Sequence, residues 1–304
     1  MARSKLNRTT GSVVFNIINY AIFALFTLVC IFPFYYLIIN TISANDMSAN
    51  GVINFFPQQI HLKNYIEVLK LRGLGQAAVI SLLRTSIGTL CTVMASAFLG
   101  FMFTQKKMWK RKLWYRYLII TMYFNAGLIP VFITMHLLGL TDNFWVYVIP
   151  AIVQPFNIIL VKTYLESVPA SLQEAAEIDG AGIFRIFYQI MLPVSLPILA
   201  TIAIFSAVGQ WNSFQDTLIY VTDQKLYSLQ YVLYQYINQA NSLATLIKNS
   251  TAMSGEAMLA LASRQTPTSV RMTVSVIVVL PIMLVYPMFQ RYFVKGIMIG
   301  SIKG

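Results

Sequence analysis

Three of the acidic residues of this chain lie close together in a stretch that could form a recognition surface. Only 10 of the 304 residues are Asp or Glu, and Glu174, Glu177 and Asp179 all fall within "QEAAEIDGAGIFRIFYQIMLP", between two long apolar segments. On a helix, Glu174 and Glu177 lie one turn apart on the same side. The neighbouring Ala175 and Ala176 are small enough to let another surface approach closely. This stretch therefore predicts a docking surface.

Patterns for catalysis are missing from the sequence. His61 and His136 are isolated, no H-x-x-x-H pair or nucleophile elbow occurs, and acidic residues are almost absent from the apolar segments. The phosphate-binding loop G-x-x-x-x-G-K-[ST] does not occur either. We therefore expect no catalytic residue, no metal site and no cofactor on this chain. If ATP drives its activity, a separate subunit must bind the nucleotide.

Composition indicates that these residues belong to a membrane protein. The chain is 57% hydrophobic and only 11% charged, with a mean hydropathy of +0.66. A bilayer core of about 30 Å requires about 20 apolar residues in a helix that satisfies its own backbone hydrogen bonds. The sequence predicts an all-α integral membrane protein with six transmembrane helices, at approximately 13–40, 77–103, 115–138, 143–166, 195–221 and 270–292.

The net charge of +12 is explained by membrane topology rather than by nucleic-acid binding. Basic residues collect in the N-terminal segment, in "QKKMWKRKLWYR" between the second and third spans, and near the C-terminus. By the positive-inside rule this arrangement predicts a multi-pass protein with both termini in the cytoplasm. Trp109 and Trp114, beside the central basic run, are expected to anchor it at the lipid interface. The bilayer is thus an expected partner, and nucleic acid is not.

The acidic stretch between the fourth and fifth spans predicts two short helices, at about 170–179 and 184–191. Gly180 and Gly182 supply the turn between them, where positive φ is tolerated, and Pro193 is expected just beyond the second helix. An amphipathic helix resting on lipid headgroups is the alternative. Such a helix carries a basic polar face, whereas this one is acidic, so docking to a protein is favoured.

Polar and aromatic residues deep in the spans are candidates for a solute pathway. If the fifth span is one helix, Trp211 shares a face with Gln215, and Asn212 shares a face with Asp216. Amide hydrogen bonds combined with aromatic stacking suit a sugar. Side chains of these types also hold transmembrane helices together, and that alternative stays open. The pathway candidates are Gln210, Trp211, Asn212, Phe214, Gln215 and Asp216, with Tyr123 and Asn125 on the third span and Gln154 and Asn157 on the fourth.

Arg84 and Asp216 are the clearest charges within or near the limits of the spans. Both are predicted toward the outer leaflet. They are expected either to pair with each other or to line the outer gate, and the sequence does not choose between these roles.

The acidic stretch resembles the EAA loop of type I ABC importer permeases. "EAAEIDGAGIFRIFYQIMLP" has its Glu, Ala, Gly, Ile, Leu and Pro residues at the family spacing. The segment "GQWNSFQDTLIYV" resembles the Trp-Asn-x-Phe element of the carbohydrate-uptake branch. The ending "LPIMLVYPMFQRYFVKGIMIGSIKG" is similar to that of the second permease subunit in maltose-type and complex-polysaccharide importers.

This resemblance implies a type I permease fold with cytoplasmic coupling helices that dock on an ATPase. It also implies a second permease subunit forming a heterodimer, two ATP-binding subunits that hold ATP and Mg, and an extracytoplasmic sugar-binding protein. The implied location is the plasma membrane of a bacterium. The residues implied in ATPase coupling are Glu174, Ala175, Ala176, Asp179, Gly180 and Pro193.

The expected function is that of a permease subunit importing oligosaccharides or polysaccharide fragments. Its organisation would be a cytoplasmic segment at 1–12, a transmembrane domain at 13–292 that includes the coupling loop at 168–193, and a cytoplasmic tail at 293–304. One alternative keeps this architecture but transports another small solute. A second is a membrane scaffold or enzyme that works without an ATPase.

Overall fold

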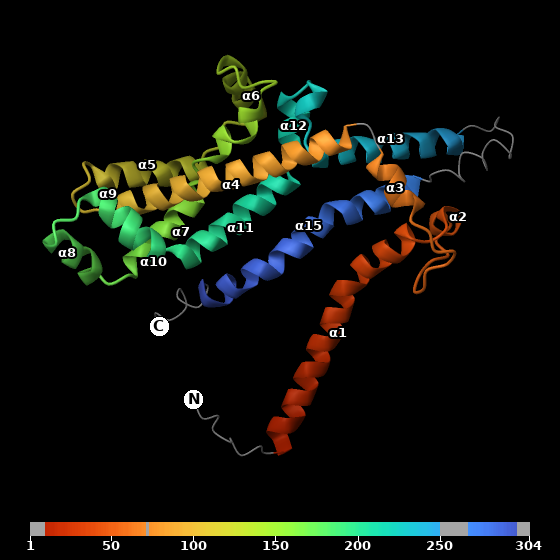
Figure 1. Ribbon diagram of the computed structural model, residues 1–304, viewed down its shortest axis with the longest axis horizontal. Helices are drawn as coiled ribbons and strands as arrows, with labels where there is room; N and C mark the ends of the chain where they lie inside the picture. The colour runs from red at the N-terminus through yellow and green to blue at the C-terminus, as the bar shows by residue number, and fades with distance from the viewer. Residues whose placement is uncertain (1–9, 71–72, 250–266, 297–304) are drawn as a thin grey trace. The chain divides into compact units, whose positions relative to one another are not determined.

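The computed structural model of the chain describes residues 10–70, 73–249 and 267–296. Helices account for all the regular structure of these residues, which contain no strand (Figure 1). The predicted all-α class is therefore confirmed. The chain divides into two compact units, one within 1–69 and 236–277 and the other within 70–235 and 278–304.

The first unit contains a long apolar helix whose C-terminal end is held by polar side chains. The Asn40 amide donates to the Ile53 carbonyl at 3.3 Å and accepts from the Ser48 hydroxyl at 2.8 Å, while the Thr41 and Tyr65 hydroxyls lie 2.7 Å apart. These bonds hold the short helices of the following connection against the end of the long one. The elements are α1 (Thr10–Thr41), α2 (Asn45–Ala49) and α3 (Lys63–Leu69), with parts of α13 (Leu229–Asn249) and α15 (Pro267–Gly296).

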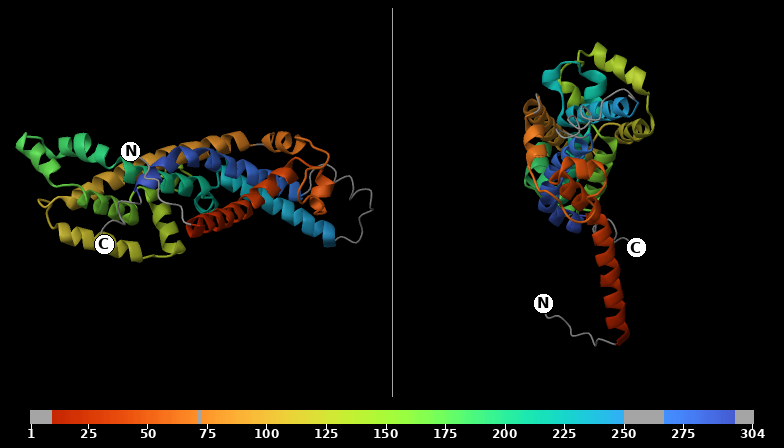
Figure 2. Two further views of the ribbon diagram at one scale, coloured as in Figure 1. Left: turned by 90° about the horizontal axis from the view of Figure 1, so that it is seen from below. Right: turned by 90° about the vertical axis from the view of Figure 1, so that its right-hand side faces the viewer.

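The second unit is built around one central helix, α4 (Leu74–Thr104), which packs against both α7 and α11 (Figures 1 and 2). The remaining elements follow in chain order. They are α5 (Arg111–Tyr123), α6 (Leu128–Leu137), η1 (Phe144–Tyr147), η2 (Ile149–Ala151), α7 (Pro155–Glu166), α8 (Ser171–Ile178), α9 (Ile183–Ile186), the π-helical η3 (Phe187–Met191), α10 (Leu192–Val194), α11 (Leu196–Asn212), α12 (Gln215–Tyr220) and η4 (Gln224–Leu226).

By length and composition, two of the described helices, α1 and α4, can each cross a membrane unaided. Three further spans arise if each bent helix pair counts as one. These pairs are α5 with α6, bent by 118°, the 144–151 turns with α7, bent by 44°, and 183–194 with α11, bent by 77°. The sixth predicted span lies within α15, whose apolar part, Thr268–Leu284, is shorter than the others.

Three of the predicted spans are not single helices. The fourth, predicted at 143–166, consists of the turns η1 and η2 followed by α7, which begins at Pro155. The third, predicted at 115–138, breaks between α5 and α6, because Gly127 takes a positive φ of 87° and Pro130 follows within the next turn. The fifth, predicted at 195–221, breaks after Asn212, where Ser213 is extended with ψ 124°. These segments were predicted from the length of their apolar sequence. That length alone does not show where polar contacts stabilise a break in the helix.

The predicted terminal segments can be compared only in part. Of the segment 1–12 the structure describes residues 10–12, which already belong to α1. Of the tail 293–304 it describes residues 293–296, which belong to α15. The rest of both segments lies outside the described residues.

The central core of the second unit lies where α4, α7 and α11 meet the acidic stretch. Phe101 from α4, Val161 from α7 and Ile202 from α11 are at most 1% exposed and pack in one cluster. Ala176 from α8 and Phe187 from η3 belong to the same cluster. The acidic stretch is therefore mounted directly on the core rather than attached by a loose loop.

The contact between α4 and α7 depends on Gly100. A Cβ at this position would lie 2.7 Å from Cβ of Val161 and 3.2 Å from the backbone nitrogen of Lys162, closer than packed atoms approach. We expect Gly100→Ala to lower the free energy of unfolding by about 1–3 kcal/mol, because the two helices must separate. Chemical or thermal unfolding of the detergent-purified protein measures this loss.

Gly75→Ala is the matched control on the same helix. A Cβ there meets nothing within 4 Å, so the substitution should be neutral or slightly stabilising. Equal stability of the Gly100→Ala and Gly75→Ala proteins would show that α4 and α7 do not touch as described.

Candidate functional site

The acidic stretch folds into a hairpin of two short helices, α8 and α9, here called the acidic hairpin (residues 171–186). The first helix, predicted at about 170–179, is confirmed as Ser171–Ile178. The turn requires a left-handed residue only at Gly180, where φ is +75°, because Gly182 has an ordinary φ of −68°. The Gly180 and Ala181 amides donate to the carbonyls of Glu177 and Ala176, which closes the end of α8.

The second helix extends further than the sequence predicted. It begins at Ile183, passes through the π-helical turn η3 and continues as α10 to Val194. The expectation that Pro193 lies beyond the helix is therefore wrong. Pro193 stands in the first turn of α10, where the missing N–H costs nothing, and the π turn before it resets the register.

The outer face of the acidic hairpin combines carboxylates with exposed apolar groups. Glu174, Ala175 and Asp179 are exposed, and Ile178 and Phe184 are 86% and 64% exposed. Large apolar side chains exposed beside charges are typical of a surface that another protein covers.

Ala176 points the other way, into the core, with 7% of its surface exposed. Its side chain therefore supports the hairpin from within. The sequence predicted instead that Ala176 would face outward with Glu174 and Ala175. Pro193 is exposed but lies on α10, beyond the hairpin itself.

The basic run after α4 fastens the acidic hairpin from the side. The Gln105 and Gln173 amides exchange two hydrogen bonds, of 2.8 and 3.3 Å, and Lys107 Nζ lies 3.1 Å from a Glu177 carboxylate oxygen. The hydrogen bond from Gln173 and the contact with Lys107 hold the pKa of Glu177 below its ordinary value, so this carboxylate stays ionised. Sequence reasoning missed this link. The available signal was that the connection after α4 is basic whereas the acidic hairpin carries the opposite charge.

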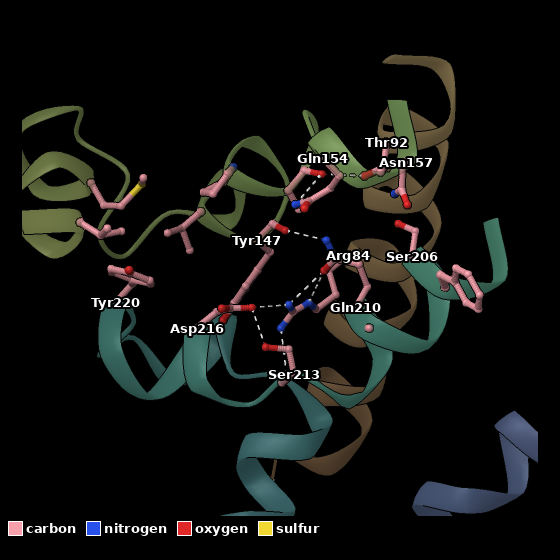
Figure 3. A pocket seen from close by; sticks show the side chains of 17 residues that line it. Arg84, Thr92, Tyr147, Gln154, Asn157, Ser206, Gln210, Ser213, Asp216 and Tyr220 are labelled. Atoms are coloured by element: carbon pink, nitrogen blue, oxygen red, sulfur yellow. Dashed lines mark hydrogen bonds and ion pairs between the residues drawn. The ribbon is translucent and has the colours of Figure 1, made fainter. Parts of the chain in front are cut away.

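A polar cavity of about 460 Å³ lies at the other end of the second unit (Figure 3). Its walls come from α4, α6, the 144–151 turns, α7, α11 and α12. The volume falls within the range of about 300–1,000 Å³ that is usual for small-molecule sites. Polar side chains converge on it from five of these six segments, since α6 contributes only Val131 and Met135, and this makes it the strongest binding-site candidate in the described part of the chain.

Arg84 and Asp216 form an ion pair in the wall of this polar cavity, with 2.6 Å between Nη2 and Oδ2. Arg84 is 1% exposed, donates to Gln210 Oε1 at 3.0 and 3.1 Å, and lies 4.4 Å from the centre of the Tyr147 ring. The question left open by the sequence is thus answered for this conformation: the two charges pair with each other, and they do so at the cavity.

Arg84 also stabilises the break in the fifth predicted span. Its Nη1 donates to the Ser213 carbonyl at 3.2 Å, and the Ser213 hydroxyl donates to Asp216 at 2.8 Å. The break satisfies the polar groups freed at the end of α11 and the start of α12. Because of it, the expected i, i+4 pairing of Trp211 with Gln215 and of Asn212 with Asp216 is wrong.

The connection between α6 and η1 is fastened to the end of α12 and the residues that follow it. The Asp142 carboxylate accepts from the backbone amide and hydroxyl of Thr222 and from the Asp223 amide, and the Asp142 amide donates to the Tyr220 carbonyl at 2.9 Å. These hydrogen bonds, chiefly that from the Thr222 hydroxyl, lower the pKa of Asp142 below its ordinary value. An ionised Asp142 therefore holds the ends of α6 and α12 together.

Of the ten pathway candidates, the structure brings four to the polar cavity: Gln154, Asn157, Gln210 and Asp216. Trp211 instead donates to the Val278 carbonyl and lines a separate apolar cavity of about 220 Å³. Asn125 accepts from the Gly127 amide, and Phe214 stacks on Tyr234 with 4.7 Å between ring centres. The other three, Tyr123, Asn212 and Gln215, are exposed. Sequence reasoning missed Tyr147, Ser206 and Tyr220 in the cavity wall, because no local motif marks them.

Relatives of the chain are components of transport systems. Residues 93–299 match the family described as "Binding-protein-dependent transport system inner membrane component". Protein LplC of Bacillus subtilis is 31% identical over 300 residues, covering 98% of both chains. The polygalacturonan/rhamnogalacturonan transport system permease protein YtcP of the same organism is 29% identical, covering 96% of this chain and 99% of YtcP.

A solved structure has the same fold over almost its whole length. It belongs to a bacterial ABC transporter involved in the import of the acidic polysaccharide alginate, with a TM-score of 0.81 and 26% identity, covering 95% of this chain and 100% of the other. The predicted resemblance to ABC importer permeases is thereby confirmed, and so is the prediction of a transport component rather than an enzyme. The chain belongs to the family of binding-protein-dependent transport system inner membrane components.

Proposed function

We propose that this chain is one of two different permease subunits in an ATP-driven bacterial importer of oligosaccharides or polysaccharide fragments. Several relatives are named for such cargo, including the YtcP permease and the arabinooligosaccharides permease AraQ of Halalkalibacterium halodurans, which is 26% identical over 93% of this chain. Two partner ATPases supply ATP and Mg, and an extracytoplasmic binding protein delivers the sugar. This cargo is preferred over other small solutes because sugar names recur among the relatives.

The observation that carries the proposal is the acidic hairpin. Its outer face presents Glu174, Asp179, Ile178 and Phe184, which no part of the chain within 10–70, 73–249 and 267–296 covers, while Ala176 anchors its inner face in the core. A rigidly mounted surface of this kind suits the transfer of force from another polypeptide, whereas a scaffold without an ATPase has no use for it. The coupling residues are Glu174, Ala175, Asp179 and Gly180, with Ala176 and Pro193 supporting them.

A continuous packed route joins the acidic hairpin to the polar cavity. Phe187, after α9, packs in one cluster with Leu199 and Ile202 of α11, and the same helix carries Gln210 at the cavity. Helices that pack this densely move as rigid bodies. Closure of the ATPases would therefore displace α11 and α4 and change access to the cavity.

The proposed topology places the acidic hairpin, the basic run and both termini in the cytoplasm. Exposed Lys106, Lys110 and Lys112 lie in the connection between α4 and α5 and at the start of α5, on the side to which the positive-inside rule assigns them. The polar cavity, which α4 lines with Arg84 and Thr92 from its middle part, then lies between the two sides of the membrane, on the path of the sugar.

Gentle extraction and affinity purification of the chain from its native membrane test this assignment. We expect co-purification with a nucleotide-binding protein and with a second, different permease chain, and ATPase activity in the isolated complex. Purification of the chain alone, or with further copies of itself only, would contradict the proposed importer.

A further inference from the structure

The polar cavity has two walls that differ in their hydrogen bonding (Figure 3). On one wall, Arg84, Gln210, Ser213 and Asp216 bond to one another, and Gln210 also donates to the Tyr147 carbonyl at 3.0 Å. Each of these four side chains already has partners within the protein. This wall therefore positions the backbone and offers few free groups to a ligand.

The opposite wall contains polar side chains whose hydrogen bonds are not made. Asn157 is only 8% exposed, yet its amide has no hydrogen-bond partner among the described residues. Ser206, whose hydroxyl is likewise unpartnered within the described part of the chain, lies beside it, and the two side chains point toward each other in Figure 3. Gln154 makes one long contact, 3.5 Å to the Ala151 carbonyl. These groups face the cavity with hydrogen-bonding capacity that the described residues do not use, so they can bond a ligand that enters it.

Aromatic rings complete the lining of the cavity, with Tyr220 on the side of Asp216 in Figure 3. Tyr220 stacks against Phe132 of α6 with 6.0 Å between ring centres, and Phe205 stands one residue before Ser206 on α11. Amides, hydroxyls and aromatic rings around a cavity of this size suit a sugar ring, which presents hydroxyls at its edge and C–H groups on its faces.

The charges of the lining decide what kind of sugar ring fits. Among the described residues that line the cavity, only Arg84 and Asp216 are charged, and they neutralise each other. The Arg84 guanidinium already donates to Gln210, Ser213 and Asp216, so it is not free to receive a second carboxylate. A uronate ring would lose hydration from its carboxylate without gaining a counter-ion, whereas an uncharged ring would lose little.

We infer that the polar cavity is a binding subsite for an uncharged, hydroxyl-rich sugar ring, with Asn157, Ser206 and Gln154 as its hydrogen-bonding groups. This inference rests on the proposed sugar import and narrows its substrate class. It separates the subsite in this chain from the acidic cargo named for the alginate importer that shares its fold. It also assigns recognition to this permease subunit and not to its partner alone.

Binding to the intact complex in lipid nanodiscs tests the inference. The probes are galactobiose and maltose, which are uncharged, and digalacturonate, which differs from a galactose disaccharide by a carboxylate in place of the C6 hydroxymethyl of each ring. We expect at least one neutral disaccharide to bind about tenfold more tightly than digalacturonate. Asn157→Ala should weaken that binding about tenfold, as expected for the loss of a neutral hydrogen bond, and Ser206→Ala severalfold.

Asn212→Ala is the control, because Asn212 is exposed outside the cavity and its loss should leave binding unchanged. Ser206→Ala removes a single oxygen and keeps the inference testable if Asn157→Ala does not fold. Three outcomes would overturn the subsite. Digalacturonate would bind more tightly than the neutral disaccharides, binding of a neutral disaccharide would survive both cavity substitutions, or no probe would bind at millimolar concentration. In these cases co-purification with an ATPase would still support the importer, so the two proposals fail separately.

Discussion

Gly180→Pro is expected to abolish sugar uptake while the chain still inserts into the membrane and remains in the complex. Gly180 has φ +75°, whereas Pro fixes φ near −65°, and the substitution removes the amide that donates to the Glu177 carbonyl. The turn between α8 and α9 cannot form in that case, and the outer face of the acidic hairpin is displaced. Uptake of labelled sugar by cells whose only copy of the subunit carries the substitution should fall to about the background level.

Glu174→Lys tests the same surface without disturbing the turn. The Glu174 carboxylate is exposed and forms no hydrogen bond or ion pair with the described residues, so the reversed charge should leave the hairpin folded. A like-charge contact in an interface costs several kcal/mol, which predicts at least a tenfold loss of uptake. In proteoliposomes, ATP hydrolysis should no longer follow the addition of sugar and binding protein.

Gly182→Ala is the matched control for both variants. It lies two residues from Gly180 with φ −68°, and an added Cβ meets nothing within 4 Å, so uptake should be unchanged. Normal uptake in the Gly180→Pro and Glu174→Lys proteins would refute the coupling role of the acidic hairpin.

Arg84→Met is expected to cause the largest loss of stability among single substitutions in the polar cavity. It removes the donors to Gln210, Ser213 and Asp216 and leaves a carboxylate in the cavity wall without its counter-ion. Breaking a fully buried pair costs about 3–5 kcal/mol, but the Asp216 side chain is 36% exposed and keeps part of its hydration, so we expect a loss of about 1–3 kcal/mol. Arg84→Lys should recover only part of this loss, since one ammonium group cannot reach three acceptors in different directions. Thermal unfolding of the purified complex measures both variants.

A double substitution distinguishes the ion pair from a simple packing effect. Combining Arg84→Met with Asp216→Asn removes both charges, so it should cost clearly less than the sum of the two single changes. Arg185→Met is the control on an exposed arginine whose guanidinium contacts Gln189, and it should change stability by no more than about 0.5 kcal/mol. Strict additivity of the two cavity substitutions would show that Arg84 and Asp216 do not stabilise each other.

The prediction of the acidic hairpin succeeded because its determinants are local. Helix α8 and the left-handed turn at Gly180 follow from residues within a few positions of one another. The resemblance to a known family likewise depends on the spacing of residues within this one stretch. The length of the second helix, the link to Lys107 and the direction of Ala176 were missed. Whether an alanine on a short helix faces the core or a partner depends on Phe101 and Val161, which come from other helices.

The pathway residues were harder to predict because helix breaks change the direction of every later side chain. Trp211 and Gln215 were assigned one face on the assumption of a continuous helix, and the break at Ser213 sends them to different surroundings. Gln154 and Asn157 were named as pathway candidates on the fourth span, but the sequence could not show that they line one cavity with Gln210.

The sequence by itself determined that this is an all-α membrane transport component with an acidic helical hairpin, because hydropathy, charge placement and local turn chemistry act over short distances along the chain. Only the tertiary structure decided which polar side chains share a cavity and that its two charges cancel. Arg84 holds the break at Ser213 from 129 positions away in the chain, and no short-range pattern encodes a contact of that separation.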